Sequence, residues 1–221
     1  MEEIKQSDIN ALINLFNKKG YKLNTRDKEI NIVGIRANTT TPNKFDDTMI
    51  LFYKDNDSWI GFQFPMTTDP GTYYLKNPMS QLGAAILKAG QWKYQIGTHY
   101  TYRALVQREA VTCIRDYNRD AILDFNNGKE TTGWYGINIH RAGVGYVAVD
   151  VDTWSAGCQV VQKYEDFKRL MELMTYHNDK YGKESIYYTL IDQRAYAREL
   201  RRKAVYLIGA AVAGIYYYLK K

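Results

Sequence analysis

The chain has 221 residues, which is room for one sizeable domain with short extensions, and its hydrophobic share of 45% is ordinary for a folded protein. The formal net charge of +6 favours acidic partners, but no nucleic-acid-binding module is present, so nucleic acid is not expected as a partner. Two cysteines make no disulfide framework, and with the three histidines they show no paired spacing typical of a zinc site. We therefore predict neither a metal ion nor a cofactor.

Residues 1–29 are predicted to form a helical extension. Ser7 is a typical N-cap, and Gly20 is a typical helix end. Between them, apolar residues recur at helical spacing: Ile9, Leu12, Ile13 and Phe16. The start of the chain carries two glutamates and lacks the basic and apolar series of a secretory signal peptide, so none is expected. The simplest interpretation is a helix that packs on the following domain, and a cell-wall-binding element is the alternative.

The pattern changes to β-strands from residue 30 to residue 193. Short runs rich in branched and aromatic side chains predict strands at residues 31–36, 48–54, 59–64, 135–140, 147–151 and 185–192. Asp55–Ser58 predicts a hairpin turn between the second and third of these strands. Residues 82–88 indicate a short helix or a loop, and the apolar stripe in residues 164–181 predicts an amphipathic helix. The domain is therefore expected to be mainly β, of the α+β class.

The strongest functional signal lies in two short segments, Gly136–His140 and Ser155–Cys158. They place a cysteine, a histidine and a glycine turn close together in the sequence. A free thiol is mostly protonated at neutral pH, so a cysteine that attacks carbonyl groups as a thiolate needs a base or a cation beside it. The arrangement predicts Cys158 as a nucleophile and His140 as its base. The alternative is a sheet histidine and a buried thiol that only happen to be close in sequence.

Written as a pattern, His140 to Cys158 reads H-x14-S-x-G-C, which resembles the signature of the L,D-transpeptidase catalytic domain (YkuD-like) family. A second segment, Phe64–Leu75, resembles the TPxGxF strand of that family. The resemblance covers residues 32–161, and nothing in residues 76–133 can be aligned. It implies an L,D-transpeptidase-like β-sandwich with flanking helices in residues 30–193, as a divergent member of phage or prophage type.

The resemblance also implies roles for four residues. Cys158 matches the nucleophile and His140 the general base, while Ser155 matches the hydroxyl residue of the motif and Gly157 its turn residue. Backbone N–H groups of the same turn are expected to stabilise the oxyanion that forms when the thiolate attacks a carbonyl carbon. The implied substrates are the stem peptides of peptidoglycan.

Four further residues are candidates for substrate binding. Arg141 follows the predicted base and could pair with a substrate carboxylate through a two-pronged contact. Trp154 precedes the cysteine turn and is interpreted as a wall of the binding groove, with core packing as the alternative. Thr72 and Tyr73 lie in the segment that resembles the family strand.

Two departures from the family pattern bear on the outcome of the reaction. Ala156 stands where the family usually has a second histidine, and Val160 stands where an asparagine or arginine often follows the cysteine. Because these positions affect binding of the acceptor, we predict hydrolysis of the stem peptide rather than 3–3 cross-linking. The alternative is a non-catalytic cell-wall-binding or virion structural protein that retains the fold.

The remaining cysteine, histidines and central charges are given structural interpretations. Cys113 is predicted to be a buried, inert thiol. His99 is interpreted as a surface or loop residue and His177 as a solvated residue at a helix end. Arg115 and Asp116 belong to a charged cluster that is expected to be an exposed face.

Residues 194–221 form the last predicted segment. A basic stretch, Arg194–Lys203, leads into the uncharged run Ala204–Leu219, which ends in tyrosines and is slightly shorter than the ~20 residues that span a bilayer. We predict a C-terminal apolar helix that anchors the protein to a membrane, with a buried helix as the alternative. The expected localisation is therefore at a membrane, or in a virus particle.

Overall fold

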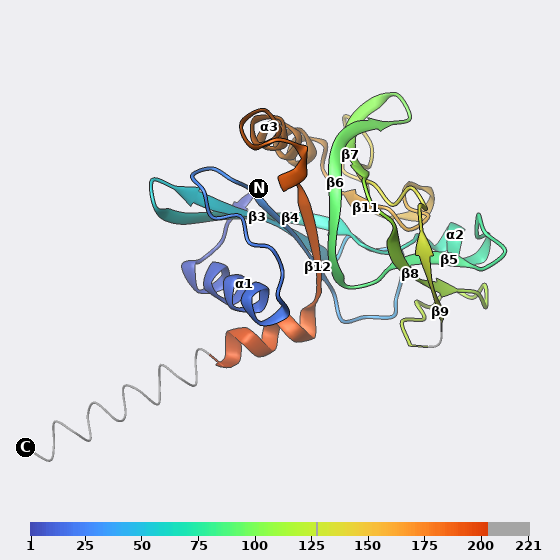
Figure 1. Ribbon diagram of the computed structural model, residues 1–221. Coiled ribbons are helices and arrows are strands. Elements are labelled where there is room, and N and C mark those ends of the chain that lie inside the picture. Colours follow the sequence, from blue (N-terminus) through green and yellow to red (C-terminus); the bar gives the residue numbers. More distant parts are fainter. Residues whose placement is uncertain (127, 203–221) are drawn as a thin grey trace, which may run out of the picture.

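The protein is described here by a computed structural model that covers residues 1–126 and 128–202 (Figure 1). Within these residues it is mainly β, of the α+β class, with one large sheet that resembles a barrel or sandwich and one small sheet. The large sheet has the strand order β1-β4-β11-β10-β7-β6-β12-β2-β3, and it closes on itself because β3 also pairs with β4. Its strands are β1 (Glu2–Glu3), β2 (Asn31–Arg36), β3 (Asp47–Asp55), β4 (Ser58–Thr67), β6 (Gly90–His99), β7 (Tyr102–Gln107), β10 (Ile139–Arg141), β11 (Gln159–Val161) and β12 (Tyr187–Asp192).

The small sheet has the order β5-β8-β9 and lies beside the large one in Figure 1. Its strands are β5 (Ala84–Leu87), β8 (Val111–Asp116) and β9 (Lys129–Gly133). Short and long helices complete the described chain: α1 (Gln6–Lys19), α2 (Thr72–Lys76), α3 (Tyr164–Tyr181), η1 (Asp152–Trp154) and η2 (Lys183–Ser185). Residues 193–202, which follow β12, are also helical.

The large sheet is apolar on both faces because it separates two cores. Successive side chains of a strand point to opposite faces. Ile32 and Leu51 therefore enter the main core, while Val33 and Phe52 enter an outer core beneath α1. This double burial explains why β2 and β3 are near-continuous apolar runs instead of alternating ones.

Helix α1 covers the outer core, which confirms the prediction of a packing helix. It begins at Gln6, one residue before the predicted cap Ser7, and the Asp8 carboxylate accepts a hydrogen bond from the Lys5 N–H at 3.2 Å. It ends at Gly20, whose φ of 66° is left-handed and favours glycine. The boundary placed after residue 29, like the one placed after residue 193, stays a prediction.

Several predicted elements are confirmed. The strands predicted at residues 31–36, 48–54 and 59–64 correspond to β2, β3 and β4, and the helix predicted at residues 164–181 is α3. The turn between β3 and β4 is a two-residue hairpin in which Asp55 pairs with Ser58. Asn56 and Asp57 both have left-handed φ angles, which asparagine and aspartate tolerate better than most residues.

Three predicted elements are wrong, and each error has a physical reason. The helix or loop predicted at residues 82–88 contains the buried strand β5, since a short apolar run fits either structure. Residues 147–151 form no strand, and Val149 is 77% exposed. Of residues 135–140 only Ile139 and His140 are in a strand, because the Gln107 side chain occupies the Tyr135 and Ile137 N–H groups in place of a neighbouring strand.

The segment Phe64–Leu75 is only partly a strand. Strand β4 ends at Thr67, residues 68–71 form a loop, and α2 begins at Thr72. Proline at position 70 cannot donate to a sheet ladder and favours this break. Thr72 and Tyr73 therefore lie on a short helix instead of on the strand that the family resemblance implies.

The predicted membrane anchor is corrected by the structure. No helix in residues 1–126 and 128–202 is long and apolar enough to cross a bilayer. The apolar segment 204–219, on which the prediction of a C-terminal apolar helix depended, lies outside the described residues. A membrane anchor therefore has no support in the described residues and the localisation at a membrane is not retained, while the virus particle stays a prediction.

His177 connects α3 to the first strand of the domain and is buried, so the prediction of a solvated side chain is wrong. Its Nδ1 accepts a hydrogen bond from the Ile30 N–H at 2.9 Å, and its Nε2 lies 2.7 Å from the Ser185 hydroxyl. Since the backbone N–H can only donate, Nδ1 is unprotonated and the proton is on Nε2. Burial lowers the pKa of His177 to about 4, so the folded protein holds the ring neutral.

We predict that His177 makes the fold acid-sensitive. A histidine whose folded pKa is lowered stabilises the protein above its unfolded pKa of 6.5, and this contribution is lost as the pH falls toward about 4. The free energy of unfolding, measured with urea near pH 7 and near pH 5, should fall more steeply in the wild type than in His177→Gln. The amide keeps one donor and one acceptor, so the variant should lose only about 1–2 kcal/mol near pH 7. Equal losses on acidification in the two proteins would contradict the assignment.

Candidate active site

The turn Ser155–Cys158 is held by the side chain of its first residue. The buried Ser155 hydroxyl donates to the Cys158 carbonyl oxygen at 2.8 Å and accepts the Gly157 N–H at 3.1 Å. Gly157 has a φ of 131°, and a side chain there would collide with the carbonyl oxygen of Ala85 in β5. Both the backbone angle and the close approach therefore require glycine at this position.

The Pro70–Gly71 loop packs directly against this turn. The Gly71 N–H donates to the Ser155 carbonyl oxygen at 2.9 Å, and a side chain at Gly71 would collide with the backbone of Asp152. The two segments that carry the family resemblance are thus in contact, although about eighty residues separate them in the sequence.

A buried polar cluster holds the loop that precedes Pro70. The Arg36 guanidinium lies 2.9 Å from the Asp69 carboxylate and donates to the Thr68 hydroxyl at 2.9 Å. The Asp47 carboxylate accepts the Thr68 N–H at 2.5 Å and the Ala37 N–H at 2.7 Å. Burial raises the pKa of both carboxyl groups, and the nearby charge of Asp69 helps to raise that of Asp47 to about 7.

The Gln159 side chain connects this cluster to the cysteine turn by hydrogen bonds. Its side-chain amide donates to the carbonyl oxygens of Thr68 and Gly157, both at 3.3 Å, and its carbonyl oxygen accepts the Tyr188 hydroxyl at 2.7 Å. Because Gln159 is fully buried and follows Cys158 directly, its contacts fix the start of β11.

Parallel pairing of β10 with β11 brings the predicted base and nucleophile to one edge of the sheet. Val160 is the register partner of His140, and the Gln159 N–H donates to the Asn138 carbonyl oxygen at 2.9 Å. Cys158 directly precedes β11, so it lies next to the residues that enter β10. The side chains of Asn138 and His140 both contact the ring of His99.

His140 is 3% exposed and is oriented by its neighbours. Its Nδ1 lies 2.9 Å from the Arg141 carbonyl oxygen, which can only accept, so we assign the proton to Nδ1. The ring stacks on the ring of His99 with the centroids 4.1 Å apart. Burial lowers the pKa of His140 to about 3, and the neighbouring His99 adds to this effect. The imidazole is therefore neutral, with an unprotonated Nε2 that could accept a proton.

The Cys158 thiol is also neutral at rest. Its sulfur lies 3.4 Å from the Gly136 carbonyl oxygen, and no hydrogen bond joins it to the ring of His140 among the described contacts. Burial raises the pKa of the thiol to about 11, although the Asn138 N–H favours the thiolate. The site therefore holds a neutral thiol and a neutral imidazole.

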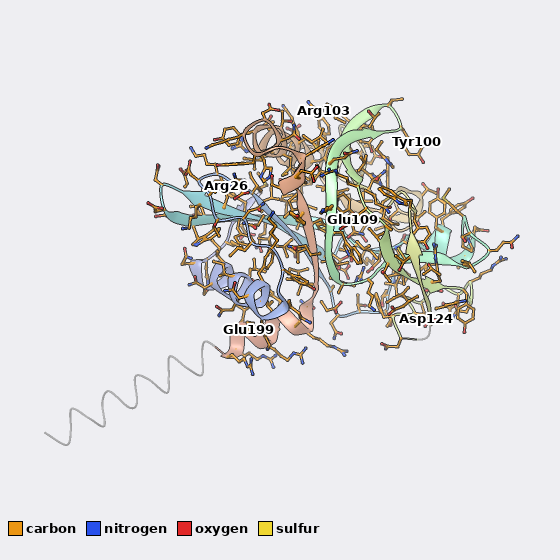
Figure 2. All side chains as sticks on the ribbon, in the orientation of Figure 1. Arg26, Tyr100, Arg103, Glu109, Asp124 and Glu199 are labelled. Carbon is orange, nitrogen blue, oxygen red and sulfur yellow. The ribbon has the colours of Figure 1, made fainter. Side chains whose placement is uncertain are left out.

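Both residues line one cavity of about 660 Å³ between the two sheets. Its walls include exposed aromatic residues, among them Tyr100, which is 85% exposed and lies at the outer end of the β6–β7 hairpin in Figure 2. The lining contains two arginines, Arg115 and Arg141, and no aspartate or glutamate among the described residues. Such a cavity favours a ligand that carries negative charge.

The structure brings together only some of the predicted site residues. Cys158, His140, Arg141 and Trp154 all line the cavity, whereas Ser155 and Gly157 shape the turn beside it. Two other predicted residues, Thr72 and Tyr73, do not line it. The tyrosine that does is Tyr74, the next residue of α2. The guanidinium of Arg141 lies 4.1 Å from the ring centre of Tyr102 and donates to the Ala142 carbonyl oxygen.

Several residues of the site were not predicted from the sequence, among them His99, Asn138 and Arg115. His99 is half-buried and lies 3.1 Å from the Asn138 amide through its Nδ1. Asn138 could have been found from its position two residues before His140 in the strand predicted at residues 135–140. Arg115 was expected on an exposed face but is 5% exposed, and no local signal distinguishes it from the solvated arginines nearby. The predicted burial of Cys113 is confirmed, since it is fully buried.

The sequence matches no protein-family model, no curated protein and no solved structure. The likeness to the L,D-transpeptidase family therefore depends on the two short motifs alone. In the part of the chain that the structure describes, no group of three or more histidine, cysteine, aspartate or glutamate side chains is arranged to hold a metal ion.

We predict that Gly157→Ala disrupts the cysteine turn. The methyl group would meet the Ala85 carbonyl oxygen at a backbone angle that favours glycine, so the free energy of unfolding should fall by about 2–4 kcal/mol. Gly145→Ala is the matched control, because its φ is 82° but nothing lies within 4 Å of the added carbon. Urea unfolding of both variants measures the difference. Equal losses would show that Ala85 does not confine the turn.

Proposed function

We propose that this chain is a cysteine-dependent enzyme with an L,D-transpeptidase-like catalytic domain that cleaves the stem peptides of peptidoglycan. The observation that carries the proposal is the pairing of Cys158 and His140 in one cavity, with the proton of the imidazole held on Nδ1 by a carbonyl oxygen. A neutral imidazole with an unprotonated Nε2 is the form that a general base requires. The same two residues occupy the positions of nucleophile and base in the motif.

The neutral pair defines the first step of the reaction. His140 Nε2 takes the proton from the Cys158 thiol as the sulfur attacks the carbonyl carbon of the scissile peptide bond. The thiol must exchange its Gly136 acceptor for Nε2 to do so. The imidazolium then protonates the departing amine, the carbon–nitrogen bond breaks, and a thioester with Cys158 remains.

Backbone N–H groups stabilise the oxyanion of this step. The Gly157 N–H already donates to Ser155, so it is not a candidate. The N–H groups of Ala156 and Cys158 belong to residues that line the cavity and are the proposed donors. Each donor of this kind contributes about 3 kcal/mol of transition-state stabilisation.

The thioester is released to water in this proposal rather than to a second peptide. Val160 is fully buried among Ala142 and Ala148, so its side chain cannot contact an acceptor strand. Ala156 lines the cavity but offers no basic group to an incoming amine. The chain therefore lacks polar acceptor contacts at the two positions where it departs from the motif.

A second function has one observation in its favour. The raised pKa of Cys158 and its hydrogen bond to Gly136 describe an inert thiol, which suits a non-catalytic protein that binds the cell wall through the same cavity. The enzyme would cleave the stem peptide, whereas the non-catalytic protein would bind it without cleaving it.

We predict that Cys158→Ala abolishes release of the terminal residue from a stem tetrapeptide. His140→Ala should lower the rate by about 10²–10⁴-fold, because it removes the base and leaves the nucleophile. Cys113→Ala is the control, since that thiol is buried in the core away from the cavity lining, and should keep most of the activity. The released amino acid is quantified by chromatography. Equal turnover in the wild type and in Cys158→Ala would exclude the proposed mechanism and leave the binding function.

We also predict that the products are tripeptides and free amino acids. Mass spectrometry of a reaction with the tetrapeptide as the only substrate distinguishes hydrolysis from cross-linking. Abundant 3–3 dimers would show that an amine competes with water for the thioester, contrary to the interpretation of Ala156 and Val160.

A further inference from the structure

Arg115 is a buried cation without a carboxylate beside it. It lies in β8, is 5% exposed, and forms no ion pair with an acidic side chain of residues 1–126 and 128–202. Its Nε donates to the Thr131 hydroxyl at 2.8 Å, and its guanidinium lies 4.2 Å from the ring centre of Tyr135. These contacts orient the side chain but do not neutralise its charge.

The other buried arginine of the described residues, Arg36, is paired with a carboxylate. Arg36 is 3% exposed, and its guanidinium lies 2.9 Å from the Asp69 carboxylate. Burying a charge without an opposite charge costs several kcal/mol, so buried arginines are normally paired. The contrast indicates that the anion that pairs with Arg115 comes from outside the described chain.

The position of Arg115 connects it to the proposed nucleophile. In the small sheet Arg115 is the register partner of Ala85, whose carbonyl oxygen closely approaches Gly157. Arg115 and Cys158 both line the same cavity. On β8, Arg115 lies on the same face as Cys113, which belongs to the main core. Near its end, β8 therefore places the Arg115 cation at the cavity wall.

The terminal nitrogens of Arg115 are available to a ligand. They make no hydrogen bond within the described residues, whereas Nε is held by Thr131. Arg141, the other arginine of the cavity, already donates to the Ala142 carbonyl oxygen and stacks on Tyr102. Two neighbouring N–H groups of one guanidinium match the two oxygens of a carboxylate.

We propose that Arg115 binds a carboxylate of the acyl donor, so that Cys158 acts on peptides with a free carboxylate close to the scissile carbonyl. This inference rests on the proposed function and narrows its substrate class. In a stem tetrapeptide the carboxylate comes either from the terminal residue or from the diamino acid. In both cases Arg115 would bind a carboxylate in the cavity that Cys158 also lines, and replacing that carboxylate by a neutral carboxamide removes the contact.

The first test does not require turnover. Iodoacetate and iodoacetamide alkylate the same sulfur, but only iodoacetate carries a carboxylate. The ratio of their rates at Cys158, measured by mass spectrometry, cancels changes in the thiolate fraction between variants. We expect this ratio to fall about tenfold in Arg115→Met, the size of one charge-assisted contact. Arg103→Met is the matched control, because it removes an exposed cation that does not line this cavity, and should leave the ratio unchanged.

The second test identifies the source of the carboxylate. Three tetrapeptides are compared as substrates of the wild type and of Arg115→Met: the free acid, its terminal carboxamide, and the peptide amidated at the diamino acid. Amidation of the carboxylate that Arg115 binds should lower kcat/KM at least tenfold in the wild type but hardly at all in Arg115→Met. Arg115→Lys keeps the charge but not the two-pronged geometry, so the effect of amidation on kcat/KM should be intermediate. This variant replaces Arg115→Met in the test if Arg115→Met does not fold.

The outcomes separate the two proposals. A selective loss of iodoacetate reactivity in Arg115→Met without tetrapeptide turnover in the wild type would support the anion site and reject peptidoglycan cleavage. Turnover that depends on Cys158, with unchanged alkylation ratios and equal use of acid and amides, would overturn the role of Arg115 and leave the enzyme. A wild-type Cys158 that reacts with neither reagent would also overturn it.

Discussion

The buried ion pair between Arg36 and Asp69 is the constraint on which the candidate site depends. Arg36 ends β2, and Asp69 lies in the loop that follows β4, so the pair ties these elements together at one end of the closed sheet. Thr68, between them in the network, accepts an amide hydrogen bond from Gln159 through its carbonyl oxygen. Because the loop then continues into Gly71, which donates to Ser155, the cysteine turn is held through backbone contacts and not by its own sequence alone.

Burial explains why the two candidate catalytic groups that line the cavity are both neutral. Burial raises the pKa of Cys158 and lowers that of His140, so neither is charged before substrate binds. Charge in the cavity comes instead from Arg115 and Arg141, and of these two arginines Arg115 is the buried one, with no carboxylate paired to it among the described residues. A cavity with this lining favours ligands that carry negative charge.

The local sequence was sufficient for elements whose pattern has one physical meaning. The apolar stripe of residues 164–181 predicted α3, and the Asp55–Ser58 turn predicted the β3–β4 hairpin, because a helical period and a two-residue turn leave few alternatives. The glycine and serine of the 155–158 turn were recognised by spacing. The central strands β6, β7, β8 and β9 were missed, since their alternation depends on which face each sheet turns to the core.

The sequence by itself determined a mainly β domain, because strand patterns are local properties of the chain. Its motif spacing also singled out Cys158 and His140, which line one cavity in the structure. Tertiary structure decided the rest of the site. It replaced Tyr73 by Tyr74 at the cavity wall, stacked His99 on His140, and buried Arg115 where an exposed residue was expected. Each of these depends on contacts between segments far apart in the chain, and both protonation states follow from burial, which no local pattern records.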